Sequence, residues 1–212
     1  MAMLNFFGHA LVAGRKCEEP AFVLGSMVPD LASMGRIRLA AVDNGALAEG
    51  VAFHHRTDTA FHGTDGFLSL CRIARAELAS QGLPRPQSMA VAHVGVELML
   101  DGVWARDGIA VTRFLKALDA APRLGAFLHW HSKDGPARWA EIGERLRSRG
   151  APIHYRDPEW LTAAIERALV HRPRLALRPG HIPIVRQCLN QLQPRVHDHS
   201  DALLQEVDAA MG

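Results

Sequence analysis

The chain has 212 residues, of which 48% are hydrophobic, and its formal net charge at pH 7 is +2. This small charge gives no support for nucleic-acid or membrane-surface binding, and no apolar run reaches the roughly 18 residues that a membrane span needs. The three cysteines form no CxxC pair, which favours free thiols in a reducing cytoplasm. We therefore expect a cytoplasmic globular protein with one compact domain over residues 1–212.

Helical periodicity dominates the sequence. Gly82 and Gly150 each follow an amphipathic stretch and predict a helix end, while Pro158 suits a first helical turn and Pro173 requires a stop before it. Pro194 is a candidate kink or break in the last helix. Few segments alternate as strands do, so we predict an all-α protein of roughly eight to ten helices. The clearest predicted helices cover 65–81, 134–150, 157–172 and 181–209.

Two polar residues stand in apolar segments near the N-terminus. His9 lies within LNFFGHALVA, where a histidine is either a satisfied core residue or a ligand. Asp30 lies within PAFVLGSMVPDLASM, and aspartate is seldom buried without a partner. The dipeptide Pro29–Asp30 is also typical of a turn or of a helix N-cap, and both readings of Asp30 stay open.

Two further segments repeat one spacing of ligand-type side chains. Residues four apart on a helix point the same way, so each set predicts a polar row on one helical face. The neighbours of both rows are mainly apolar, and a buried unpaired charge costs several kcal/mol. The rows consist of His54, Asp58 and His62 in GVAFHHRTDTAFH, and of His93, Glu97 and Asp101 in AVAHVGVELMLDGVW.

Two arrangements would offset that cost. One is a closed network of ion pairs and hydrogen bonds without a metal. The other is a divalent cation held by imidazoles and carboxylates, a donor set that suits Mn, Fe, Zn or, less well, Mg. Four separate segments supply such side chains and cationic partners near them are few, with Arg56 the obvious one. We therefore favour the cation, with Mn²⁺ as the first expectation.

These residues resemble the acyl carrier protein phosphodiesterase family, a divergent all-α relative of the HD-type metal-dependent phosphohydrolases. The resemblance covers most of the chain in the family's order, although each motif is short. The matching motifs are NFFGH ending at His9, LGSMVPD with Gly25 and Asp30, GVAFHHRTD with Gly50, His54, Arg56 and Asp58, the triplet His93, Glu97 and Trp104, and HRPRL at 171–175.

The chain also departs from the family pattern. Ser26 replaces an asparagine, His93 and Glu97 replace two aspartates, and Leu98 replaces a histidine. Ligand-type side chains at positions 93 and 97 keep a metal site in the prediction but leave the substrate open. A fainter similarity links PAFVLGSMVPDL with zinc-dependent phospholipase C-like proteins.

The resemblance implies an HD-like fold and hydrolysis of the phosphodiester that joins 4′-phosphopantetheine to acyl carrier protein. For such a reaction we expect Asp30 to be catalytic as well as a ligand. We also expect Arg56 to bind phosphate and His62 to protonate the leaving serine oxygen. Arg172 and Arg174 would dock the acidic acyl carrier protein. The expected metal ligands are His9, Asp30, His54, Asp58, His93 and Glu97.

Two other functions stay open. One is an HD-like or phospholipase C-like phosphohydrolase that acts on a nucleotide or another small phosphate ester. The other is a non-catalytic helical protein, whose polar cluster is structural or binds a metal without turnover.

Overall fold

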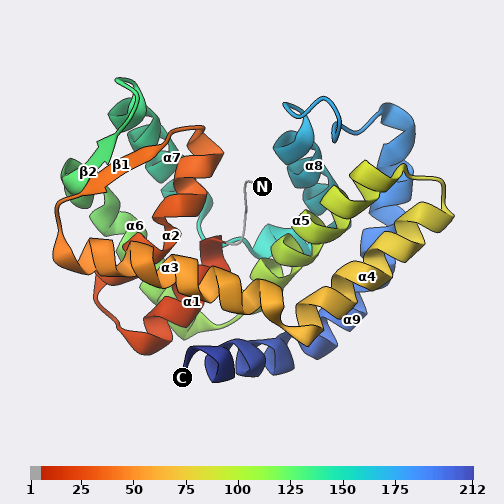
Figure 1. The fold of residues 1–212 in the computed structure, drawn as a ribbon, viewed down its shortest axis with the longest axis horizontal. Coiled ribbons are helices and arrows are strands. Elements are labelled where there is room, and N and C mark those ends of the chain that lie inside the picture. The colour runs from red at the N-terminus through yellow and green to blue at the C-terminus, as the bar shows by residue number, and fades with distance from the viewer. Residues whose placement is uncertain (1–5) are drawn as a thin grey trace. The chain divides into compact units, whose positions relative to one another are not determined.

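The computed structural model describes residues 6–212, which are almost entirely helical (Figure 1). The predicted all-α class is therefore confirmed. Within the described part of the chain, no helix has both the length and the apolar character needed to cross a bilayer. The helices are α1 (Phe6–Lys16), α2 (Pro20–Gly35), α3 (Gly45–Gly63), α4 (Asp65–Ser80), α5 (Arg85–Trp104), α6 (Gly108–Leu124), α7 (Gly135–Arg149), α8 (Pro158–Leu169) and α9 (Ile182–Met211).

The predicted helix ends agree with the structure to within a few residues. Gly82 and Gly150 both have positive φ, 87° and 71°, which explains why α4 and α7 end just before them. Helix α8 ends at Leu169, before the predicted limit. Helix α9 continues through Pro194, which lies on the exposed side of the helix, as does Asn190. Water can therefore hydrogen-bond the Asn190 carbonyl that the proline leaves without a donor.

A short antiparallel pair of strands interrupts the helices. Strand β1 (Leu39–Val42) pairs with β2 (Leu128–Trp130), with Val42 opposite Leu128 and a register irregularity between Leu39 and Ala41. Both strands are too short to show an alternating pattern in the sequence. Three 3₁₀ turns complete the structure: η1 (Gly125–Phe127), η2 (Ile153–Arg156) and η3 (Pro179–His181).

The chain packs as two compact units, each built from two stretches of sequence. The first unit comprises the residues up to 59 together with 104–152, and the second comprises 60–103 together with 153–210. Helices α3 and α5 each begin in one unit and end in the other. The single domain expected over residues 1–212 stays a prediction.

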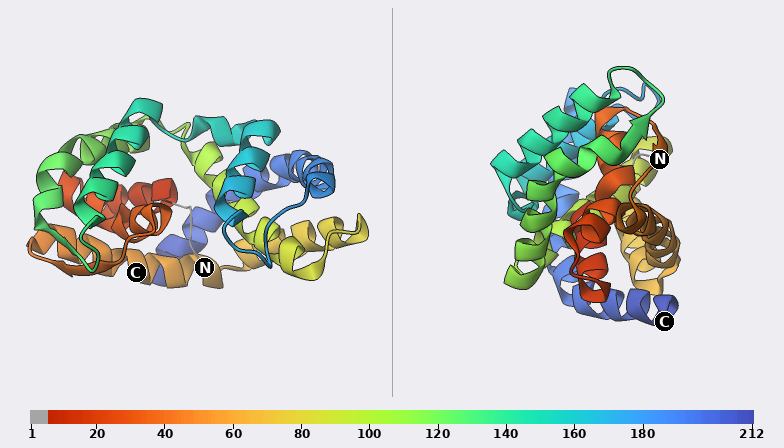
Figure 2. Two further views of the ribbon diagram at one scale, coloured as in Figure 1. Left: turned by 90° about the horizontal axis from the view of Figure 1, so that it is seen from above. Right: turned by 90° about the vertical axis from the view of Figure 1, so that its left-hand side faces the viewer.

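In the first unit, α2 packs against α1, α6 and α7 (Figure 1, Figure 2). The ring of Phe114 on α6 lies 5.9 Å from Phe6 and 5.2 Å from Phe7, both on α1. These three rings are almost completely buried, so aromatic packing holds α1 and α6 together. Helix α1 thereby takes a fixed position beside α2.

Helices α2 and α3 cross at two glycines with their backbones in contact. A Cβ atom placed on Gly25 would lie 2.3 Å from the carbonyl oxygen of Leu47, and one on Gly50 would lie 2.2 Å from that of Phe22. No side chain fits at either position, so both glycines are required by the close approach. This crossing places the central part of α2 against α3.

In the second unit, α5 is the central helix. Gly95 of α5 faces Leu189 on α9 and Ile165 on α8, at a point where a Cβ would lie 2.9 Å from the leucine side chain. On α4, the Cys71 thiol donates to the carbonyl of Ala92 at 3.9 Å. Helix α5 is thus covered by α4, α8 and α9, which explains why its sequence is apolar on nearly every side.

We expect Gly50→Ala to destabilise the first unit strongly. The added methyl would meet the Phe22 carbonyl and the Gly25 Cα, which are backbone atoms that cannot turn aside. The free energy of unfolding should fall by about 2 kcal/mol or more, as in other overpacked cores. Chemical denaturation followed by circular dichroism measures this change.

Gly45→Ala is the matched control on the same helix, because a Cβ there meets no atom within 4 Å. The free energy of unfolding of this variant should be unchanged or slightly raised, since alanine has a higher helix propensity than glycine. Equal stabilities of the two variants would contradict the close crossing.

Candidate metal centres

The first cluster, in the first unit, consists of His9 on α1, Asp30 on α2, and His54 and Asp58 on α3. His9, Asp30 and His54 are buried, and Asp58 is partly exposed. The Nε2 atom of His9 lies 3.9 Å from Asp30 Oδ2 and 3.9 Å from Asp58 Oδ1. Donor atoms of His9, His54 and Asp58 lie within 4.8 Å of one another, so these three side chains could hold a metal ion.

The glycine crossing explains how α2 and α3 bring this cluster together. His54 stands one helical turn after Gly50, and Asp58 one turn after His54. Ser26 directly follows Gly25, and its backbone carbonyl accepts a hydrogen bond from His54 Nδ1 at 2.8 Å. Asp30 lies inside α2 and is 2% exposed, so the alternative of a turn or N-cap at this position is wrong.

Hydrogen bonds at Nδ1 set the tautomers of both histidines. The Ser26 carbonyl can only accept, so His54 Nδ1 carries a proton. The Nδ1 of His9 lies 2.9 Å from Thr57 Oγ1, whose single proton is directed to the carbonyl of Phe53 or of His54, at 3.1 and 3.0 Å. The Thr57 oxygen therefore accepts from His9 Nδ1. In the neutral ring of each histidine, the lone pair is on Nε2.

The distances from His9 to the two carboxylates are those of ligands around a shared ion and not of direct hydrogen bonds. An N–H group and a carboxylate in a hydrogen bond are about 2.7–3.2 Å apart, and 3.9 Å is too long. Ligands that surround one ion at about 2.0–2.2 Å lie about 3–4 Å from each other. Metal-bound histidines also characteristically donate their other N–H to a protein oxygen, as His9 and His54 do here. The geometry therefore fits a cation between these groups.

The second cluster, in the second unit, consists of His62 near the end of α3 with His93 and Glu97 on α5. Its three donor atoms are in mutual contact: Glu97 Oε1 lies 3.0 Å from Nε2 of each histidine, and the two Nε2 atoms are 3.2 Å apart. Glu97 is completely buried. These three side chains could also hold a metal ion.

The six ligands expected from the sequence thus fall into two groups. His9, Asp30, His54 and Asp58 lie in the first cluster, while His93 and Glu97 lie in the second together with His62. Asp101 is buried one turn after Glu97, but it belongs to neither metal-capable group among residues 6–212. The first residue of the NFFGH motif, Asn5, lies outside the described residues.

The predicted arginines lie outside both clusters. Arg56 is exposed, and its Cζ lies 5.6 Å from the ring centre of Phe53. Because it is two residues after His54, it is on the far side of α3 from the cluster. Arg172 and Arg174 follow α8 in the second unit; Arg172 is partly exposed and Arg174 is exposed.

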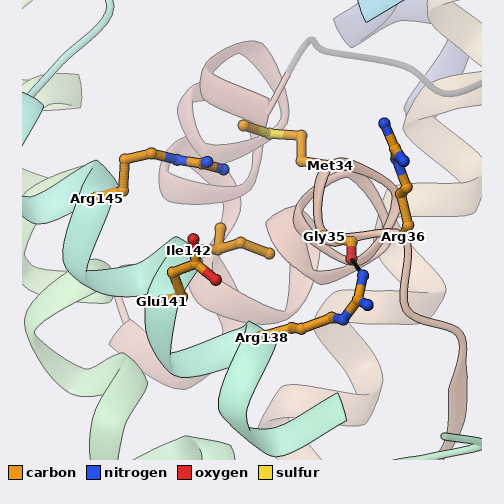
Figure 3. A pocket seen from close by; sticks show the side chains of 7 residues that line it. All are labelled: Met34, Gly35, Arg36, Arg138, Glu141, Ile142 and Arg145. Carbon is orange, nitrogen blue, oxygen red and sulfur yellow. Dashed lines mark hydrogen bonds between the residues drawn. The ribbon is translucent and has the colours of Figure 1, made fainter. Parts of the chain in front are cut away.

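Sequence reasoning missed two features of the first unit. One is the Thr57 hydroxyl, whose position three residues after His54 on the same helical face was the only available signal. The other is a hollow of about 250 Å³ between α2 and α7 (Figure 3). Its lining is rich in arginine: Met34, Gly35, Arg36, Arg138, Glu141, Ile142 and Arg145.

Two cysteines in the second unit have perturbed acidity. Burial, together with the negative charge of Glu97, raises the pKa of Cys71 to about 12. Burial and the charge of Glu77 raise the pKa of Cys188 to about 12. Both thiols therefore stay protonated at neutral pH, and neither is a ready nucleophile.

Comparison with known proteins gives no match: neither a protein-family model, nor a curated protein, nor a solved structure is similar to this chain. The resemblance drawn from the short motifs accordingly stays a prediction.

Cys71 and Cys188 should react slowly with iodoacetamide in the native protein. At pH 8 a thiol with a pKa near 12 is about 0.01% thiolate, which is about a thousandfold below an ordinary cysteine. Mass spectrometry of the native and the guanidinium-denatured chain, both with a chelator present, measures each rate. Cys17, which is partly exposed as Cys71 is, serves as the internal reference. Equal native and denatured rates at Cys71 would contradict its raised pKa.

Thr57→Val should weaken metal binding by about 10–100-fold, because it removes the oxygen that orients His9. Valine keeps the shape of threonine, so the helix should remain intact. Thr59→Val is the matched control, since Thr59 is exposed on the same helix and its hydroxyl bonds only the His55 carbonyl among the described hydrogen bonds. Calorimetric titration with Mn²⁺ compares them, and identical isotherms would show that Thr57 does not orient a ligand.

Proposed function

We propose that this protein is a metal-dependent phosphoric ester hydrolase with an HD-like helical fold, and that the reaction takes place at the first cluster. One observation carries the proposal. His9 and His54 each engage Nδ1 in a hydrogen bond to an oxygen, which leaves Nε2 as the donor atom toward Asp58. Two oriented imidazoles and a carboxylate form a donor set that Mn²⁺, Fe²⁺ and Zn²⁺ accept.

The residues of the first cluster divide into ligands and a proton acceptor. His9, His54 and Asp58 would hold the ion, since their donor atoms are all close together. Asp30 is near His9 but outside that set, so we assign it to accept the proton of the attacking water. The bound ion would supply Lewis-acid chemistry, acidifying water and neutralising phosphoryl oxygens. Burial of Asp30 excludes bulk water that would otherwise compete for this proton.

The arginine-rich hollow supports an anionic substrate. Met34, which lines it, follows Asp30 by one turn on the same face of α2. Figure 3 shows Arg145 extending from α7 toward α2 and Arg138 bonded to the Gly35 carbonyl, at 3.3 Å. A guanidinium group can bind two phosphate oxygens at once. Glu141 is the acidic residue of the lining, and Arg138 also pairs with Asp134 through its Nε atom, at 2.6 Å. We assign the contact with the substrate's charged groups to this hollow, in place of Arg56.

The narrower form of the proposal is hydrolysis of the phosphodiester between 4′-phosphopantetheine and acyl carrier protein. The motif resemblance supports this substrate, and the exposed Arg174 with its neighbour Arg172 would suit an acidic partner. A cytoplasmic location belongs to the same proposal. If the substrate is a small phosphate ester, the first cluster and the hollow would suffice to bind it, and Arg172 and Arg174 would have no role.

Asp30→Asn should lower kcat by about 10²–10⁴ while Mn²⁺ still binds, because the amide cannot accept the proton. Hydrolysis of bis-p-nitrophenyl phosphate with Mn²⁺ measures turnover, and calorimetry measures binding. Asp43→Asn is the control in the same unit, since Asp43 is exposed and pairs with His129. Full turnover by Asp30→Asn would remove Asp30 from the mechanism. Phosphopantetheine release from holo-acyl carrier protein then decides between the two substrates.

A further inference from the structure

The reaction proposed above for the first cluster uses none of the residues of the second. The second includes His62, whose expected role as proton donor to the leaving oxygen stays a prediction. We propose that His62, His93 and Glu97 form a metal site of their own, which takes one first-row transition-metal ion such as Zn²⁺ and keeps coordination positions open. The inference uses only residues of the second unit, and it does not depend on phosphoesterase activity.

The three donor atoms already have the spacing of ligands around one ion. Their separations are 3.0, 3.0 and 3.2 Å. Ligands about 2.1 Å from a metal lie about 3.0 Å apart in an octahedral site and about 3.4 Å apart in a tetrahedral one. An ion about 1 Å above the plane of the three atoms would therefore bond all of them without moving any side chain.

Neighbouring rings hold the two histidines in this orientation. The imidazoles of His62 and His93 are nearly parallel, with an interplanar angle of 9° and centroids 4.9 Å apart. The ring of Phe67, in the first turn of α4, meets both edge-on, at 5.0 Å from His62 and 5.2 Å from His93. Thr64 caps α4 by accepting from the Phe67 backbone N–H, which fixes the corner between α3 and α4. The site is thus organised before any ion arrives.

A network without metal explains the cluster less well. If Glu97 Oε1 accepted from both histidines, its Oε2 would stay buried without a hydrogen-bond partner among residues 6–212. Such a group costs about 1–3 kcal/mol. If both Nε2 atoms carry a proton, they face each other at 3.2 Å as two donors. If only one does and donates to the other, the lone pair of the accepting nitrogen faces the Glu97 carboxylate oxygen at 3.0 Å. A cation bonded to both nitrogens and the carboxylate removes the repulsion and balances the buried charge.

The donor set and its exposure indicate the kind of ion. Two imidazole nitrogens and one carboxylate oxygen favour Zn²⁺, Co²⁺ or Fe²⁺ over Mg²⁺ and Ca²⁺, which prefer oxygen ligands alone. The side chains of His62 and His93 are 23% and 25% exposed, so the site opens to solvent on their side. With only three protein ligands, the ion would keep positions for water or for an oxygen-containing ligand.

The experiment is titration of the full-length, metal-free protein with Zn²⁺ and with Co²⁺. We expect His93→Ala and Glu97→Gln each to lower the Zn²⁺ content by one ion per chain and to abolish the visible Co²⁺ absorption of this site. His199→Ala is the matched control, because His199 is an exposed histidine of the same unit and should leave the content unchanged. Circular dichroism confirms that each variant is folded.

His54→Ala separates this inference from the proposed function. It should remove the ion of the first cluster and leave the ion that depends on His93. If His93→Ala and Glu97→Gln both bind as much Zn²⁺ as the unsubstituted protein, the second site is wrong, whatever His54→Ala does. If His54→Ala leaves the Zn²⁺ content unchanged while His93→Ala and Glu97→Gln lower it, the first cluster is not a metal centre and the second site stands.

Discussion

The backbone contact between Gly25 and Gly50 determines the first cluster. Because no side chain separates α2 from α3 at this point, the Ser26 carbonyl comes within hydrogen-bonding distance of His54. Asp30 is buried on α2 beyond the same crossing. Aromatic packing of α1 against α6 positions α1, the helix that carries His9. A larger helix separation would leave His54 without its acceptor, and the direction of its Nε2 atom would no longer be set.

Burial of charged side chains is the main cost in both clusters. A carboxylate such as that of Glu97, which is completely buried, is costly to bury unless a positive partner lies beside it. The ion pairs described for Glu97 are with His62 and His93 alone, and a histidine is cationic only when protonated. A divalent ion would offset this cost, which is the physical reason to propose that both clusters are metal centres.

The spacing of residues along each helix could be predicted from the sequence, whereas the grouping of residues from different helices could not. The i, i+4 pairs His54–Asp58 and His93–Glu97 do point the same way, as the helical period requires. The sequence gives no hint that His62 joins His93, because that contact depends on the packing of α3 with α5. The roles of Thr57 and of the Ser26 carbonyl were also hidden, since backbone acceptors carry no residue-specific signal.

The ligands of the two clusters are distributed over the helices in the same way. Each cluster takes an i, i+4 pair from one helix, which the helix holds rigid, and a third donor from another helix: His9 of α1 for the pair on α3, and His62 of α3 for the pair on α5. An ion bound to all three donors would therefore also hold two helices together. Its binding free energy would add to the stability of the packing in that unit, because an unfolded chain offers no preformed site. Metal binding would thus couple to folding within each unit, because of the way the ligands are distributed along the chain.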